Sequence, residues 1–215
     1  MTDINLTIDG EEVAVTPGTT ILSAAGETGV VIPTLCHRPE LSVEGNCRIC
    51  VVEVEGSPRL VASCHTPVSE GMVIHTQSAR VLKARKVIME LLLAGHTGPC
   101  VTDECARECE VHCLAAELEV GPPRFGVRRR RFYPVETLSP YVRRDLSRCI
   151  LCRRCIRACT EIAEKNILHM AYRGFSSKVV TGCDEELNAE VCRDCGVCIE
   201  YCPTSALLKP SEEVA

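Results

Sequence analysis

The sequence predicts an α+β chain of several small domains, on the basis of its length, its apolar patterns and its cysteines. Its 215 residues are enough for one to three such domains. Two alternating runs flank Asp9 and Gly10 within residues 4–15, which is the signature of a β-hairpin. Residues 78–93 repeat apolar positions with a helical period instead. Seventeen cysteines and no tryptophan indicate that metal sites help to hold these segments together.

The cysteine count and the net charge indicate in which cellular compartment the protein works and which kinds of partner it binds. An odd number of cysteines cannot pair completely into disulfides. Residues 1–15 lack the basic start, the apolar stretch and the cleavage site of a secretory signal. No apolar run reaches the roughly 18 residues that a transmembrane helix needs. We therefore expect a reducing, cytoplasmic location and no membrane span, and the net charge of −5 argues against nucleic acid as a main partner.

The first domain is expected to be rich in strands. After the hairpin, a helix over residues 19–29 begins near Thr19 or Thr20 and has Gly29 past its end. Further strands are expected within residues 47–56 and 72–77. The helix over residues 78–93 then presents one broad face. That face consists of Val81, Leu82, Arg85, Ile88, Met89 and Leu92.

The remaining boundaries follow from helix-ending residues and composition. A short helix is expected over residues 114–121 and stops at Gly121, before two prolines. Residues 122–140 look like an extended connector. Its arginines either balance the negative charge of nearby clusters or meet an acidic partner surface, or they form a solvated basic linker. The expected domains are residues 1–77, the helical segment 78–121, the connector 122–140 and the last module 141–210.

The last module contains the same four-cysteine motif twice. Both copies, at residues 149–159 and 192–202, have the spacing C-x2-C-x2-C-x3-C, and only the second is followed by proline. A cubane cluster of four irons takes one thiolate per iron, so three close cysteines can wrap one side while a fourth comes from elsewhere. A four-cysteine zinc site is the alternative, but zinc needs no third evenly spaced thiol.

This module resembles the bacterial two-[4Fe–4S] ferredoxins, in which each motif lends its fourth cysteine to the other cluster. Cys159 is followed by Thr160 where the family often has proline, which affects the turn rather than the bond to iron. The resemblance implies that one cluster is held by Cys149, Cys152, Cys155 and Cys202. It implies that the second is held by Cys159, Cys192, Cys195 and Cys198.

The N-terminal domain carries Cys36, Cys47, Cys50 and Cys64, spaced C-x10-C-x2-C-x13-C. The plant-type ferredoxin motif has a shorter first gap but the same inner C-x2-C and late fourth thiol. Together with GTTILSAAGETGVVIPTLC at residues 18–36, the spacing resembles the [2Fe–2S] domain of the complex I large iron–sulfur subunit and its relatives. The resemblance implies a β-grasp ferredoxin fold and a [2Fe–2S] cluster on these four cysteines. A zinc loop held by the same thiols is the alternative.

The same family carries a [4Fe–4S] cluster on the motif H-x3-C-x2-C-x5-C, after an amphipathic helix. The middle cysteine of that motif is Asp103 here, and Cys105 follows two residues later. Two ligand sets stay open: His96, Cys100, Cys105 and Cys109, or the same cysteines with Cys113 in place of His96. Three cysteines along one helix would span about 12 Å at ~1.5 Å per residue, which is long for one cubane and favours the histidine set.

Several residues of this region have plainer interpretations. His96 could instead interact with the C-terminal end of a helix dipole. His112 is expected on the helix surface, and His37 and His65 are expected to shape loops or face solvent. Cys183 fits no cluster and is expected to be an ordinary thiol. No phosphate-binding glycine loop and no Ser/His/Asp arrangement is evident, so neither a nicotinamide nor a flavin site is expected.

The order of one [2Fe–2S] and three [4Fe–4S] clusters resembles the diaphorase iron–sulfur subunit of NAD-linked soluble hydrogenases and formate dehydrogenases. It is similar also to the N-terminal part of iron-only hydrogenases. The resemblance implies a non-catalytic electron-transfer subunit. Its implied partners are a flavoprotein that oxidises NAD(P)H and a catalytic hydrogenase or formate dehydrogenase subunit. Because the sequence stops at Ala215, we expect the catalytic domain on another subunit.

Two other functions remain open at this stage. The chain could be a free-standing soluble polyferredoxin that carries electrons between enzymes. It could also be a zinc-stabilised interaction module, in which the cysteines serve folding alone. Iron and acid-labile sulfide distinguish the second from the first.

Overall fold

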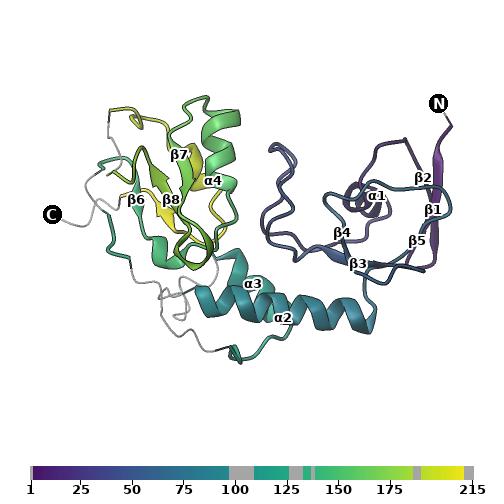
Figure 1. Cartoon of the computed structure of the whole chain (residues 1–215). Helices are drawn as coiled ribbons and strands as arrows, with labels where there is room; N and C mark the ends of the chain where they lie inside the picture. Colours follow the sequence, from purple (N-terminus) through teal and green to yellow (C-terminus); the bar gives the residue numbers. More distant parts are fainter. Residues whose placement is uncertain (1, 97–108, 126–132, 137–138, 186–189, 211–215) are drawn as a thin grey trace. The chain divides into compact units, whose positions relative to one another are not determined.

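The computed structural model describes residues 2–96, 109–125, 133–136, 139–185 and 190–210 (Figure 1). The chain divides into two compact units, each with its own apolar core. The first unit comprises Met1–His37, Val43–Glu90 and Leu114–Pro122. The second comprises Arg38–Ser42, Leu91–Cys113 and Pro123–Ala215.

The first unit is built on a five-stranded mixed sheet in the order β2-β1-β5-β3-β4. The hairpin expected from the sequence is confirmed, since β1 and β2 pair antiparallel around Asp9 and Gly10, which both have positive φ. β1 pairs parallel with β5, while β3 pairs antiparallel with both β4 and β5. The strands are β1 (Ile4–Ile8), β2 (Glu11–Val15), β3 (Val51–Val54), β4 (Val61–Ala62) and β5 (Val73–His75).

Helix α1 (Ile21–Glu27) supplies the other side of this core. The Thr20 hydroxyl accepts a hydrogen bond from the Ser23 backbone N–H at 3.3 Å, which caps the helix start as the sequence predicts. The buried helix residues Ile21, Ala24 and Ala25 join one cluster with sheet residues such as Ile8 and Ile74. The result is a two-layer α/β unit.

Two further helices flank the cysteine-dense region. Helix α2 (Ala79–Gly95) confirms the predicted amphipathic helix, with Val81, Arg85 and Met89 buried at intervals of four residues. The charged Arg85 thus sits within the apolar face. Helix α3 (Glu110–Glu117) starts earlier than the expected helix over 114–121 and ends before Gly121.

The second unit consists of short elements between cysteines. Two antiparallel pairs, β6 (Arg143–Arg144) with β9 (Leu207–Leu208) and β7 (Leu168–Ala171) with β8 (Lys178–Thr181), contribute to one core. That core contains sulfur ligand candidates as well as aliphatic side chains. The helical turns are η1 (Leu146–Arg148), α4 (Arg154–Arg157), the π-helical η2 (Ala158–Ile162), η3 (Gly174–Ser176) and α5 (Val197–Glu200).

The structure thus has the mixed α and β content that the sequence predicts. Among the described residues, no helix combines the length and apolar character that a membrane span requires.

Candidate metal centres

The two four-cysteine motifs of the second unit form two loops of the same conformation. Leu151 and Asp194, which occupy equivalent positions, have φ of 57° and 55°. The next equivalent pair, Arg153 and Gly196, have φ of 61° and 62°. Side chains rarely adopt this left-handed region, so its recurrence at matching positions marks a specific loop rather than chance. In each copy a short helix, α4 or α5, begins directly after the loop.

The first loop contributes three cysteines to a pocket of about 390 Å³ of empty space, partly open to solvent. Apolar side chains including Leu146, Val179 and Leu207 form the rest of its wall. The Leu151 backbone N–H donates to Cys149 Sγ at 3.4 Å, as expected where a loop turns its amides toward a thiolate. The cysteines that line the pocket are Cys149, Cys152, Cys155 and Cys202.

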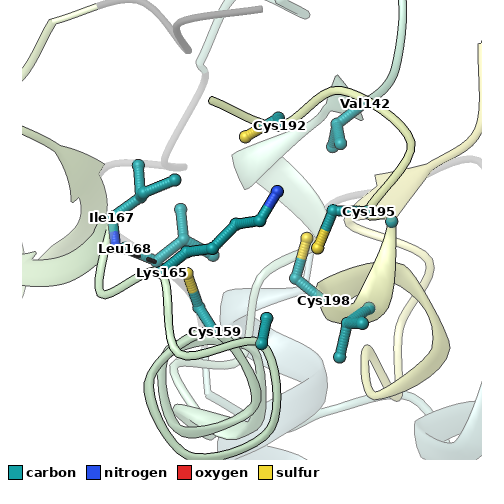
Figure 2. A pocket seen from close by; sticks show the side chains of 11 residues that line it. Val142, Cys159, Lys165, Ile167, Leu168, Cys192, Cys195 and Cys198 are labelled. Atoms are coloured by element: carbon teal, nitrogen blue, oxygen red, sulfur yellow. Dashed lines mark hydrogen bonds between the residues drawn. The ribbon is translucent and has the colours of Figure 1, made fainter. Parts of the chain in front are cut away.

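The second loop forms a comparable pocket of about 360 Å³, again partly open to solvent. Figure 2 shows the Lys165 side chain reaching across it. The Lys165 ammonium donates to the Val191 carbonyl at 2.7 Å, and the Ile167 backbone N–H donates to Cys159 Sγ at 3.3 Å. The cysteines around this pocket are Cys159, Cys192, Cys195 and Cys198 (Figure 2). Each pocket is therefore lined by three cysteines of one motif and one cysteine of the other.

Burial holds three of these thiols in the protonated form. Burial raises the pKa of Cys152 and of Cys155 well above the ordinary value, and it raises the pKa of Cys198 to about 12. A bound metal ion replaces the protons and converts each thiol into a thiolate ligand. Four soft sulfur donors around an apolar pocket fit an iron–sulfur cluster.

In the first unit, four cysteines associate in two pairs. The Cys47 backbone N–H donates to Cys36 Sγ at 3.4 Å, and the sulfurs of Cys50 and Cys64 lie 3.4 Å apart. Two thiolates on one tetrahedral metal ion, with bonds of about 2.3 Å, lie roughly 3.7 Å apart. The sulfurs of Cys50 and Cys64 therefore have nearly the spacing of two ligands that share one metal ion. With Cys36 and Cys47 as the second pair, the arrangement fits a cluster with two irons.

Hydrogen bonding separates the thiol pKa values within the Cys50–Cys64 pair. The hydrogen bond with Cys64 lowers the pKa of Cys50 to about 6, whereas the same bond raises the pKa of Cys64. Between Cys36 and Cys47, the hydrogen bond raises the pKa of Cys47. Gly45, with φ of +60°, lies in the loop between these two cysteines and allows it to turn.

The third candidate centre starts from His96, directly after α2. Its Nδ1 atom lies 2.7 Å from the Arg148 carbonyl oxygen, so the ring donates its N–H there. The other ring nitrogen, Nε2, lies 3.6 Å from Cys109 Sγ. Burial lowers the pKa of His96 and keeps the ring neutral. A histidine held in this way presents a bare Nε2, which is the form that binds a metal.

His112 is closer to this centre than its expected place on the helix surface. Its Nδ1 atom lies 3.3 Å from Cys109 Sγ, and its ring centroid is 5.0 Å from that of His96. The ligand atoms of His96, Cys109 and His112 all lie within 4.8 Å of one another. The reason is the helical spacing, because residues three apart share a face. That i,i+3 relationship to Cys109 is the signal that could have identified His112 from the sequence.

The structure brings together only part of the third predicted ligand set. Cys100 and Cys105 lie outside the described residues, as does Asp103. Cys113, the alternative to His96, is exposed, whereas His96 and Cys109 are buried. Cys183 is likewise exposed.

Buried arginines lie next to the cysteine loops of the second unit. Arg154 is 2% exposed, and its Nη1 donates to Glu110 Oε1 at 2.7 Å. Arg148 pairs with Asp145 at 3.0 Å. Each of these buried guanidinium groups is thus compensated by a carboxylate, as burial of a charge requires.

Two known domain families match this chain. Residues 1–79 match a family described as a 2Fe-2S iron–sulfur cluster binding domain. Residues 139–208 match the ferredoxin-like domain of NADH-quinone oxidoreductase subunit 3. A [2Fe–2S] ferredoxin-like domain and a [4Fe–4S] ferredoxin-like domain are thus both present, and the chain binds iron–sulfur clusters.

Several curated proteins resemble nearly the whole chain. The NADP-reducing hydrogenase subunit HndD of Solidesulfovibrio fructosivorans is 39% identical over 220 residues, covering 97% of this chain and 36% of that protein. The mitochondrial NADH-ubiquinone oxidoreductase 78 kDa subunit of Candida albicans is 35% identical over 215 residues, covering 96% of this chain and 28% of that protein. The chain therefore spans about a third of the length of these relatives.

A solved structure covers both chains more evenly. The crystal structure of an NAD+-reducing [NiFe]-hydrogenase in the H2-reduced state contains a chain that is 30% identical to this one, with a TM-score of 0.78. The similarity covers 95% of this chain and 86% of that one. The likeness therefore extends over both units.

Proposed function

Because the chain belongs to the family of diaphorase-type iron–sulfur subunits of NAD-linked hydrogenases, related to the complex I iron–sulfur subunit, we propose that it is an electron-transfer subunit with four clusters. These are one [2Fe–2S] and three [4Fe–4S] clusters. The observation that carries the proposal is the pair of pockets in the second unit, each lined by four cysteines that come from both motifs.

We assign the ligands by the groups that lie together. The [2Fe–2S] cluster takes Cys36, Cys47, Cys50 and Cys64, with Cys50 and Cys64 on one iron. The ferredoxin-like cubanes take Cys149, Cys152, Cys155 and Cys202, and Cys159, Cys192, Cys195 and Cys198. The third cubane takes His96, Cys100, Cys105 and Cys109. The buried, oriented ring of His96 supports it over the exposed Cys113.

The clusters, when bound, supply one-electron transfer at potentials between roughly −700 and +450 mV. The chain's own residues hold the sulfurs in apolar surroundings and direct backbone N–H groups at Cys149 and Cys159. A hydrogen bond and one peptide link connect His96 through the Arg148 carbonyl to Cys149. This short connection supports electron exchange between the third centre and a neighbouring cubane.

The proposed partners follow from the relatives. One is a flavoprotein that oxidises NAD(P)H, and the other is a catalytic hydrogenase or formate dehydrogenase subunit, in a cytoplasmic complex. The names of the relatives support a link to NAD(P) and hydrogen: they include an NADP-reducing hydrogenase subunit and an NAD+-reducing [NiFe]-hydrogenase. This chain itself has no catalytic role in the proposal.

Metal analysis of anaerobically purified protein tests the cluster content. The proposal predicts about 14 irons per chain with an equal amount of acid-labile sulfide, since each cluster type contains as many sulfides as irons. EPR of the reduced protein should show one [2Fe–2S] and several [4Fe–4S] signals. Zinc without sulfide would instead identify a zinc-stabilised interaction module.

Isolation of the native assembly tests the role as a subunit. Co-migration with a flavoprotein through size exclusion, together with NAD(P)H-dependent reduction of the clusters, is the expected result. A chain that carries the clusters but migrates alone, and exchanges electrons with several enzymes, would be a free-standing carrier.

A further inference from the structure

One buried charge in the first unit has no role in the ligand sets above. Arg85 lies in the middle of the apolar face of α2, between Val81 and Met89, and is only 1% exposed. Burial of a charged group without compensation is strongly unfavourable, even after relaxation of the surroundings. A buried arginine therefore needs a negatively charged group nearby to offset this cost, or a function that requires the charge.

The hydrogen bonds of Arg85 do not provide that partner. Its Nη2 donates to the backbone carbonyl of Val51 at 2.9 Å, while its Nε has no hydrogen-bond acceptor within the described part of the chain. No carboxylate among the described residues forms an ion pair with it. Asp9 acts on Arg85 through space, but both Asp9 oxygens accept hydrogen bonds from Thr76.

The position of the guanidinium points to the cluster ligands. Val51, which accepts its hydrogen bond, directly follows Cys50 at the start of β3. Burial lowers the pKa of Arg85, and negative charge at Cys50 opposes that shift. Arg85, Cys50 and Cys64 are each 1% exposed, so solvent screens a charge interaction between the cation and these ligands only weakly.

A [2Fe–2S] cluster on four thiolates carries a net negative charge, which grows by one unit when the cluster is reduced. We propose that Arg85 is the buried counter-charge of this cluster, acting as a positioning residue that raises its reduction potential. The inference rests on the proposed [2Fe–2S] site. Arg85 stays protonated under all relevant conditions, so its effect is that of a fixed charge. It favours the reduced form because that form is more negative.

Two variants distinguish the charge from the guanidinium group itself. Arg85→Lys keeps the charge but loses the planar guanidinium, whereas Arg85→Gln removes the charge and leaves a shorter, neutral side chain with N–H donors. The matched control is Arg80→Gln, near the start of α2, where the arginine is exposed and pairs with Glu53 at 3.3 Å. The measurement is an EPR-monitored redox titration of the [2Fe–2S] signal in the full-length, cluster-loaded chain.

The expected result is a lower [2Fe–2S] potential in Arg85→Gln, a near wild-type potential in Arg85→Lys and no shift in Arg80→Gln. The potentials of the [4Fe–4S] clusters should not change. A wild-type potential in Arg85→Gln, or an equal shift in Arg85→Lys, overturns the role of the charge. If Arg85→Gln assembles no [2Fe–2S] cluster, Arg85→Lys decides: assembly with a normal potential supports the proposal, and failure to assemble overturns it. Absence of the signal in the wild-type chain would contradict the proposed [2Fe–2S] site instead.

Discussion

The Nδ1 atom of His96 lies 2.7 Å from the backbone oxygen of Arg148, the residue before Cys149. This contact fixes the tautomer of the ring and turns Nε2 toward Cys109. It also ties the position of the third centre to the loop that presents the first cubane ligand. A substitution of His96 therefore tests both the ligand and the connection.

We expect His96→Cys to retain the third cluster and to lower its potential, because a thiolate makes the cluster more negative than a neutral imidazole does. His96→Ala should lose that cluster and reduce the iron content by up to about four atoms per chain. Redox titration and iron analysis measure the two effects. His65→Ala, at an exposed histidine, is the control. An unchanged iron content and potential in both His96 variants would exclude the ring as a ligand.

Because each motif supplies one ligand to the other cluster, substitutions in the two motifs should cause loss of opposite clusters. Cys202→Ser should damage the cluster on Cys149, Cys152 and Cys155, although Cys202 belongs to the second motif. Cys159→Ser, in the first motif, should damage the cluster on the second motif in the same way. Cluster-specific EPR signals of the two variants would show opposite losses, and Cys183→Ser should preserve both. Loss of the cluster nearest in sequence would contradict the crossing.

Removal of iron should expose a disulfide-forming pair. The sulfurs of Cys50 and Cys64 lie 3.4 Å apart, and Cys50, with its pKa lowered to about 6, is a thiolate at neutral pH. A mild oxidant such as diamide should take two electrons from the Cys50 thiolate and the Cys64 thiol, which loses its proton, and leave a disulfide; the reduced oxidant takes up that proton and one more from solvent. The rate should rise as the pH increases through about 6 and then level off.

Peptide mapping after controlled removal of the cluster checks this outcome. Cluster-loaded protein is the control, because iron occupies both sulfurs and protects them. Joining of Cys50 to Cys36 or Cys47 instead would contradict the observed pairing of the thiols.

The ion pair between Arg144 and Glu136 should contribute to the stability of the second unit. Arg144 is 2% exposed, and its Nε and Nη2 donate to the two Glu136 oxygens at 2.9 and 2.8 Å. Glu136→Gln removes the charge that compensates this buried guanidinium, at a cost of about 1–3 kcal/mol. Anaerobic urea unfolding of the cluster-loaded chain measures the change.

Glu40→Gln is the matched control for that measurement. Glu40 is exposed and its partner Arg38 is 38% exposed, so loss of the pair should cost less than about 1 kcal/mol. Equal effects of the two substitutions would show that burial of Arg144 does not matter.

The local elements of the first unit followed from sequence patterns. Alternation around Asp9 and Gly10 predicted the hairpin, and helical periodicity predicted α2, because these signals depend only on near neighbours. The parallel pairing of β1 with β5 could not be predicted in this way. It joins residues far apart in the chain, and its register depends on the core that both strands share with α1.

The sequence by itself determined the kind of chemistry, because the spacing of cysteines limits which thiols can wrap one metal cluster. Periodicity placed Arg85 and His112 on helices, but it assigned them to an apolar face and to solvent. Only the tertiary structure decided that Arg85 is buried beside β3, which begins directly after Cys50, and that His112 lies against Cys109. Burial and through-space charge depend on which elements pack together, and a linear pattern does not contain that information.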